Sequence, residues 1–147
     1  MTPARFVATM GGAGLMRPAP GTWGSAVVLP LALLGPEACL VLAVVLAAAG
    51  WWAAHQVLEE ASDPGWFVAD EGAGMLLTLA ALASVTWVGV VAAFLLFRLL
   101  DILKPWPVSW ADRQPGPTGV MLDDILAGAI AAVALLACQA AFPGALS

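Results

Sequence analysis

Two adjacent carboxylates, Asp123 and Asp124, stand in the stretch GVMLDDILAGAI, which otherwise has the composition of a membrane helix. An aspartate at the centre of a membrane helix costs roughly 2.5–3.5 kcal/mol on insertion scales, so a neighbouring pair does not suit a lipid-facing wall. A second pair, Asp70 and Glu71, opens another apolar segment in VADEGAGM. The helix dipole also stabilises acidic side chains at the start of a helix, which accounts for one member of this second pair.

Basic side chains accompany a fifth acid in FRLLDILKPWP. Arg98, Asp101 and Lys104 recur every three residues and therefore share one helical face, and Pro105 ends the helix directly after them. A solvated salt-bridge ladder is the plain interpretation of such spacing. The apolar flanks favour another, in which these charges line the mouth of a pocket.

Carboxylates that converge in so apolar a chain repel one another unless a cation lies among them. The five expected to share one membrane face are Asp70, Glu71, Asp101, Asp123 and Asp124. Oxygen ligands of this kind suit Mg²⁺, which usually joins a few carboxylates to substrate phosphate. Arg98 and Lys104 would bind phosphate oxygens, the arginine in a bidentate manner. This combination at a membrane surface predicts phosphoryl chemistry on a lipid headgroup.

Three further residues have a functional and a structural interpretation. His55, the only histidine, is a candidate catalytic residue, although a lone histidine at a helix end more often caps the helix or lies at the interface. Thr22 and Ser25 in PGTWGS offer hydroxyls, beside free backbone N–H groups, that would touch phosphate or merely cap the first helix. The sequence leaves these alternatives open.

The composition predicts an integral membrane protein. Of 147 residues, 62% are hydrophobic and 10% are charged, and the mean hydropathy is +0.95. Soluble domains carry about a quarter charged residues, so this chain has too few polar groups to cover its own surface, and lipid is the simplest solvent for it. Five Lys and Arg residues in all exclude a nucleic-acid footprint. The two cysteines lack the spacing of a metal site.

Four apolar stretches are candidate membrane segments: Ser25–Leu34, Ala38–Ala54, Gly72–Phe97 and Ile125–Phe142. Only the third clearly exceeds the ~20 residues that cross a bilayer as one helix. Crossing as a straight rod would put the acids at its two ends on opposite sides of the membrane. A shared site therefore requires a hairpin in this stretch, with its turn near Ser84 and Thr86. A second hairpin at Gly35 would return His55 to the same side.

We therefore predict an all-α polytopic membrane bundle with about four to five membrane-embedded helices and two hairpins. It is expected to form one domain over 1–147, with an N-terminal tail over 1–20 and an active-site segment over 98–124. Arginines and lysines flank the proposed active-site face, so the positive-inside bias makes that face cytoplasmic. The sequence predicts no oligomeric state.

Four motifs together resemble the bacterial phosphatidylglycerophosphatase A family. They are PAPGTWGS, ADEGAGM, FRLLDILKPWPVSWADR and GVMLDDILAG, and they span Pro18 to Gly128 in the family's order. The resemblance implies a magnesium-dependent phosphatase of the bacterial inner membrane that converts phosphatidylglycerophosphate to phosphatidylglycerol. It places the family's acids on the five carboxylates above and its basic positions on Arg98 and Lys104. Ala73 departs from the bulkier apolar residue expected there, which affects packing more than chemistry.

The resulting hypothesis is metal-assisted hydrolysis of a phosphomonoester. Asp123, Asp124 and one or both of Asp70 and Glu71 would hold Mg²⁺. The candidate catalytic residues are Asp101, Asp123, Asp124 and His55, and the candidate phosphate-binding residues are Arg98, Lys104, Thr22 and Ser25. Direct attack by water and formation of a phospho-aspartate both stay open.

Two other functions compete with this hypothesis. A small non-enzymatic cation carrier would bind metal at the acids without turnover and would have no need for Arg98 or Lys104. A lipid-headgroup transferase would be expected to show a D-G-x-x-A-R signature, and DDILAG lacks its arginine.

Overall fold

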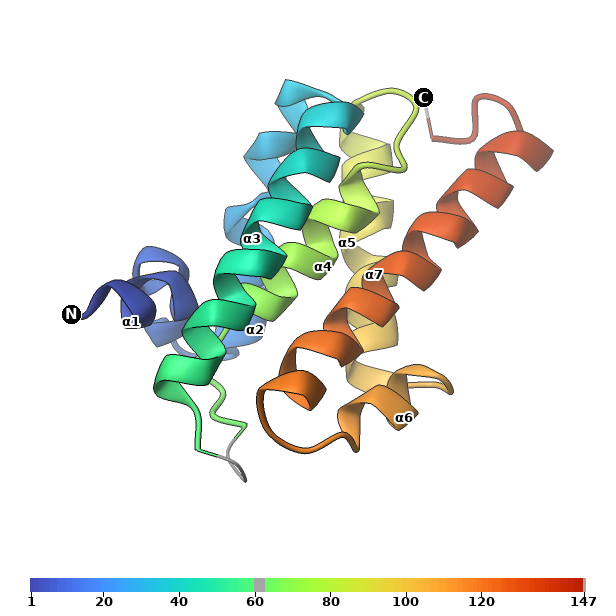
Figure 1. Ribbon diagram of the computed structural model, residues 1–147. Coiled ribbons are helices and arrows are strands. Elements are labelled where there is room, and N and C mark those ends of the chain that lie inside the picture. The colour runs from blue at the N-terminus through green and yellow to red at the C-terminus, as the bar shows by residue number, and fades with distance from the viewer. Residues whose placement is uncertain (60–62, 147) are drawn as a thin grey trace.

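The computed structural model describes residues 1–59 and 63–146, and all regular structure in these ranges is helical (Figure 1). The longer helices form a bundle: α3 (Pro36–Val57), α4 (Ala69–Leu79), α5 (Trp87–Leu103) and α7 (Gly116–Ala141). The shorter elements are α1 (Pro3–Ala8), α2 (Pro20–Val27) and α6 (Val108–Asp112), with two 3₁₀ segments, η1 (Met10–Leu15) and η2 (Leu29–Leu34). The predicted all-α class is confirmed.

The central helix of the bundle is α4, although it is the shortest of the bundle helices. It packs against α2, α3, α5 and α7, and nearly all of its 11 residues are buried. At 1.5 Å per residue it is roughly 16 Å long, about half the hydrocarbon thickness of a bilayer. A helix this short and this buried is positioned by its neighbours. The packing of α3 and α7 therefore determines where the first turn of α4 lies.

Glycines allow α4 and α7 to touch backbone to backbone. A Cβ atom added to Gly74 would lie 2.4 Å from the carbonyl oxygen of Asp124, and one added to Gly128 would lie 2.4 Å from the carbonyl oxygen of Gly74. The Thr78 hydroxyl donates to the Gly74 carbonyl at 2.9 Å and lies 3.3 Å from the Gly128 carbonyl. Small residues are typical of helix crossings in membranes, where close packing replaces the hydrophobic drive for association. This crossing sets the Asp124 backbone directly against α4.

Both predicted hairpins are present. Gly35, at φ 93°, separates η2 from α3, and Pro36 occupies the first turn of α3. The long third apolar stretch folds back between α4 and α5, and the Thr86 hydroxyl caps α5 by accepting from the Gly89 amide at 3.0 Å. Its arms have 11 and 17 residues, so the two halves of the hairpin are unequal.

The turn between α4 and α5 begins earlier than Ser84 because α7 supplies its hydrogen-bond partners. The Gln139 side-chain amide donates to the Ala81 carbonyl at 2.8 Å, and its oxygen accepts from the Ala83 amide at 2.8 Å. Backbone groups left unpaired in an apolar environment are costly. This long-range contact therefore lets α4 stop early, and no local pattern in the sequence indicates it.

Residues 1–20, expected to be a tail, fold onto the bundle. α1 packs against α3, and η1 packs against α2. Ala4 and Ala8 are buried, and the Arg5 guanidinium lies 4.6 Å from the centroid of the Trp66 ring. The small side chains that allow this packing carry almost no hydrophobic periodicity, which is why the pattern did not predict it.

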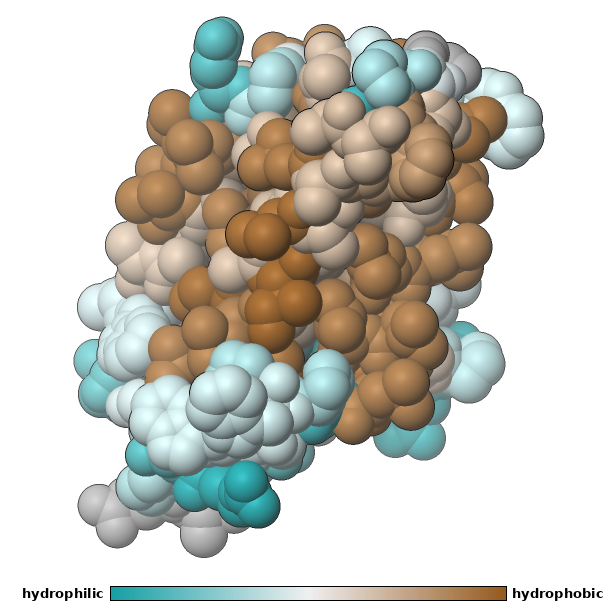
Figure 2. All heavy atoms as spheres, turned by 90° about the vertical axis from the view of Figure 1, so that its right-hand side faces the viewer, coloured by the Kyte–Doolittle hydropathy of each residue, from teal (hydrophilic) through white to brown (hydrophobic). Residues whose placement is uncertain are grey.

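Within residues 1–59 and 63–146, two helices, α3 and α7, are long and apolar enough to cross a membrane, fewer than the four to five embedded helices predicted. Only 28% of the apolar window of α3 and 44% of that of α7 are buried. Large apolar side chains are exposed on α3, α5 and α7, among them Val41, Val44, Leu95, Leu99, Val133 and Leu136. On the face drawn in Figure 2, hydrophobic residues fill the middle and hydrophilic residues gather towards both ends.

Replacing Gly128 by alanine is expected to destabilise the protein by about 1–3 kcal/mol, because the new methyl group overpacks the crossing of α4 and α7. Thermal unfolding in detergent measures the loss. Gly65→Ala is the matched control, since a Cβ there meets nothing within 4 Å. Equal unfolding midpoints for the two variants would contradict the backbone contact between these helices.

Candidate active site

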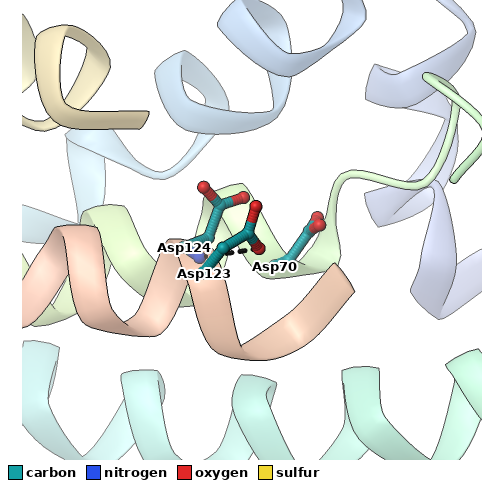
Figure 3. Close-up of side chains that lie close together, drawn as sticks. All are labelled: Asp70, Asp123 and Asp124. Atoms are coloured by element: carbon teal, nitrogen blue, oxygen red, sulfur yellow. Dashed lines mark hydrogen bonds between the residues drawn. The ribbon is translucent and has the colours of Figure 1, made fainter. Parts of the chain in front are cut away.

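Three buried carboxylates from two helices converge beside the crossing of α4 and α7 (Figure 3). Asp70 belongs to the first turn of α4, and Asp123 and Asp124 lie on α7. Each offers a carboxylate oxygen, and these oxygens all lie within 4.8 Å of one another. The three residues are 5%, 5% and 3% exposed. The structure thus brings together acidic pairs that are far apart in the sequence.

The local backbone helps to hold each acidic pair. Asp70 Oδ1 accepts from the Glu71 amide at 3.0 Å, and Asp123 Oδ1 accepts from the Asp124 amide at 2.9 Å. Asp70 and Glu71 also occupy the first turn of α4, where the helix dipole stabilises negative charge. The helix-start interpretation therefore holds for both residues, and Asp70 belongs in addition to the acidic group.

The acidic group contains a buried oxygen that nothing else satisfies. Asp124 Oδ1 has no hydrogen-bond partner among the residues that the structure describes. A buried acceptor in this condition costs free energy unless a donor or a cation meets it. Carboxylate oxygens are hard ligands, so the donor set of Asp70, Asp123 and Asp124 fits Mg²⁺ better than it fits a soft metal.

Arg98 and Asp101 bring the end of α5 to the same site. Arg98 Nη1 forms an ion pair with Asp101, and the Asp101 carboxyl group lies close to Asp124 and Glu71. Arg98 Nε and Glu71 Oε2 are buried and have no hydrogen-bond partner within the described ranges. A guanidinium with an unused buried donor suits an incoming anion such as a phosphate oxygen.

Lys104 ends α5 in the left-handed conformation, at φ 46° and ψ 57°. Its Nζ donates to Asp123 Oδ2 at 2.7 Å and also to Asp112 on α6. Burial by itself lowers the pKa of Lys104, but the hydrogen bonds and charges of Asp112 and Asp123 outweigh burial and raise the pKa. Because a raised lysine pKa keeps the ammonium protonated to higher pH, Lys104 stays a cation and offsets part of the acidic group's charge.

The PGTWGS motif lies against Glu71 and Arg98. A Cβ added to Gly21 would lie 2.3 Å from Glu71 Oε1 and 3.3 Å from Arg98 Nη1, so only glycine permits this approach of α2. Thr22 follows in the first turn of α2 and is half-buried. Ser25 is fully buried, and its hydroxyl donates to the Gly21 carbonyl at 2.9 Å, so this hydroxyl is used within α2.

His55 lies outside the acidic group. It occupies the exposed last turn of α3, where its Nδ1 is 2.8 Å from the Trp51 carbonyl oxygen. The described metal-compatible group consists of aspartates alone. This position fits the helix-end interpretation of His55 better than the catalytic one.

A sequence model for the family described as Phosphatidylglycerophosphatase A matches residues 6–139. The chain belongs to this family. It is 36% identical to phosphatidylglycerophosphatase A of Haemophilus influenzae, over 95% of this chain and 90% of the relative. It is 40% identical to the Escherichia coli protein of the same name, over 88% of this chain and 80% of the relative. These matches make the chain a phosphatase.

A third relative broadens the range of named substrates. A Bacteroides thetaiotaomicron protein, provisionally named a phosphatidylinositol-3-phosphatase, is 39% identical over 84% of this chain and 85% of its own length. No solved structure matches the chain.

Sequence analysis did not single out Gly21 or Asp112, which the geometry places at the site. Asp112 reaches Lys104 because the chain reverses after α5 at Pro105 and Pro107 and α6 then packs against α7. The two prolines were the available signal for this reversal. The role of Gly21 depends on the approach of α2 to Glu71, which no local spacing reveals.

Lys104→Met is expected to lower stability in cation-free detergent by about 2 kcal/mol, because it removes the charged hydrogen-bond partner of a buried aspartate. Asp112→Asn is the matched comparison and should cost less. The Asp112 side chain is 40% exposed and that of Asp123 is 7% exposed. Water can therefore compensate for loss of the Lys104–Asp112 pair but not for loss of the Lys104–Asp123 pair. Thermal unfolding in the presence of a chelator measures both variants, and an equal loss would argue against a structural role for the Lys104–Asp123 pair.

Proposed function

We propose that this phosphatase hydrolyses the terminal phosphate of phosphatidylglycerophosphate with the help of Mg²⁺ held by Asp70, Asp123 and Asp124. The observation that carries the proposal is the buried group of three carboxylates with an unpartnered oxygen on Asp124. Arg98 and Lys104 stand beside this group, as a phosphate substrate requires. The two relatives named phosphatidylglycerophosphatase A support the identity of the lipid.

Each charged residue has a separate task in this proposal. Bound Mg²⁺ supplies Lewis-acid stabilisation of the charge on the phosphoryl oxygens. Arg98 binds a phosphate oxygen through its unused donor while Asp101 holds the guanidinium in place. Lys104 limits the repulsion around Asp123. In the overall reaction the bond between phosphorus and the glycerol oxygen breaks, water provides the new phosphate oxygen, and the alcohol product takes up a proton.

The cation-carrier alternative is disfavoured by the same arrangement. A carrier needs a metal site that can release its ion, and it has no use for a guanidinium placed beside the carboxylates. The named relatives are phosphatases. A phosphoinositide monoester is the second substrate class to test, because the Bacteroides relative is named for one.

The bundle is proposed to lie in the bacterial inner membrane, with the acids at the cytoplasmic end. α3, α5 and α7 would cross the bilayer as single helices. The shorter α4 would carry the chain across together with the turn that follows it, and α2 would do so together with η2. With 17 residues, α5 is roughly 26 Å long, close to the hydrocarbon thickness. α6 and the start of α7 lie at one end of the bundle, and the α4–α5 turn lies at the other (Figure 1). Lys104 and Arg113 mark the first end as cytoplasmic.

Asp124→Asn should lower kcat/KM for phosphate release by about 100-fold or more, because it removes a charged metal ligand. It should also abolish the rise in unfolding temperature that Mg²⁺ causes in the unaltered protein. His55→Gln is the control and should keep nearly full activity. Full activity of Asp124→Asn at saturating Mg²⁺, or of the chelator-treated unaltered protein, would refute the metal site. Faster turnover of phosphatidylinositol 3-phosphate than of phosphatidylglycerophosphate would make the phosphoinositide the preferred substrate.

The proposed orientation predicts which residues an impermeant thiol reagent reaches in intact cells. In a chain with Cys39 and Cys138 replaced by alanine, Ser84→Cys should be labelled from outside. Arg113→Cys should be labelled only after the membrane is permeabilised. Labelling of both positions from one side would contradict the separation of the α4–α5 turn from the acidic end.

A further inference from the structure

A cavity is formed by segments that lead into the acidic site, and the mechanism above does not use it. It is formed by the end of η1, the segment leading into α2 and the chain just before α4, with Gly14, Arg17, Pro20 and Trp66 among its lining residues. Its volume is about 480 Å³, which lies in the ordinary range of small-molecule sites. The cavity is therefore large enough to hold part of a lipid headgroup.

Both stretches of chain that line this cavity lead into the active site. On one wall, Pro20 is followed by Gly21, where an added Cβ would lie 2.3 Å from Glu71 Oε1. On the other wall, Trp66 leads through a short segment to Asp70 at the start of α4. The cavity and the acidic group are thus formed by the same two stretches of chain.

Arg17 gives the cavity an anion-binding group. Arg98 and Lys104 form ion pairs with aspartates, and Arg5 stacks on the Trp66 ring. Arg17 is exposed and forms no ion pair with another described residue. Its planar guanidinium offers five N–H donors in a fork that matches phosphate oxygens. An uncommitted arginine in a cavity beside a phosphatase site calls for a second anionic group on the substrate.

The proposed substrate has such a group. Phosphatidylglycerophosphate carries a terminal phosphomonoester and an inner phosphodiester, which are separated by a single glycerol unit. We infer that the cavity is a headgroup subsite in which Arg17 binds the inner phosphodiester while the acidic site receives the terminal phosphate. This inference rests on the proposed function and makes Arg17 a specificity-determining residue that distinguishes lipids with two phosphate groups from lipids with one.

Kinetics in neutral detergent micelles test the inference, because the micelle itself then carries no charge that could attract or repel Arg17. Arg17→Gln is compared with Arg113→Gln, which removes the same charge from an exposed arginine outside the cavity. Two competitive inhibitors probe the two ends of the substrate separately. Inorganic phosphate resembles the terminal group, and phosphatidylglycerol carries only the inner phosphodiester.

Arg17→Gln should raise KM for phosphatidylglycerophosphate by about tenfold with little change in kcat, as expected when a charge-assisted contact made in both ground and transition states is lost. Inhibition by phosphatidylglycerol should weaken by a similar factor, and inhibition by inorganic phosphate should not change. Arg17→Lys should recover part of the loss, and Arg113→Gln should behave like the unaltered protein.

Three results would overturn the subsite. One is an unchanged KM in Arg17→Gln when the unaltered protein is active on the lipid. Another is an equal loss in Arg113→Gln, which would indicate a general effect of surface charge. The third is a parallel weakening of inhibition by inorganic phosphate, which would place the effect of Arg17 at the acidic site or on folding. Failure of the unaltered protein to hydrolyse phosphatidylglycerophosphate would instead reject the proposed function, and the subsite with it.

Discussion

The backbone contact between α4 and α7 is the constraint on which the site depends. Gly74 and Gly128 let the two helices approach until carbonyl oxygens occupy the space that side chains would fill. This approach places Asp70 beside Asp123 and Asp124. Like charges about 4–5 Å apart repel by roughly 3–4 kcal/mol at an effective dielectric constant of 20, so the packing energy of the bundle is used to hold an arrangement that its own electrostatics oppose. Under the proposed function, a site held in this way would be formed before the cation binds.

The basic residues around the acids have a double role that follows from the same repulsion. Lys104 and Arg98 are ion-paired with carboxylates and therefore stabilise the folded site. The Arg98 guanidinium also keeps a buried donor without a partner among the described residues, and Glu71 keeps a buried acceptor in the same condition. Residual hydrogen-bonding capacity in a buried polar group is unfavourable in the resting protein and favourable when a ligand uses it. Under the proposed function, the unused Arg98 donor is the group that a bound phosphate would meet.

The two ends of the bundle differ in structure: one contains the α4–α5 turn and the other contains the acids. At the end opposite the acids, Gln139 pairs with the backbone of the α4–α5 turn, so that a short helix can stop inside an apolar environment. At the acidic end, α7 extends beyond the aspartates, and Asp124 lies roughly 12 Å along the helix from Gly116 at 1.5 Å per residue. The acids are therefore recessed from the end of the bundle, and the stretches of chain that lead to them also form the cavity lined by Arg17.

The residue types and their order in the sequence determined the all-α class, the acidic pairs and the basic residues beside them, because composition and helical spacing are local properties of the chain. The hairpin in the third apolar stretch could also be predicted, since charges at both of its ends had to share a site. Three features could not be predicted from the sequence: the packing of residues 1–20 onto the bundle, the short central α4 and the partners of Lys104. They depend on which small residues meet across helices, as Gly21 meets Glu71 and Gly74 meets Gly128. Only the tertiary structure decided these contacts, because a glycine shows in the sequence where a backbone can approach closely but not which backbone will do so.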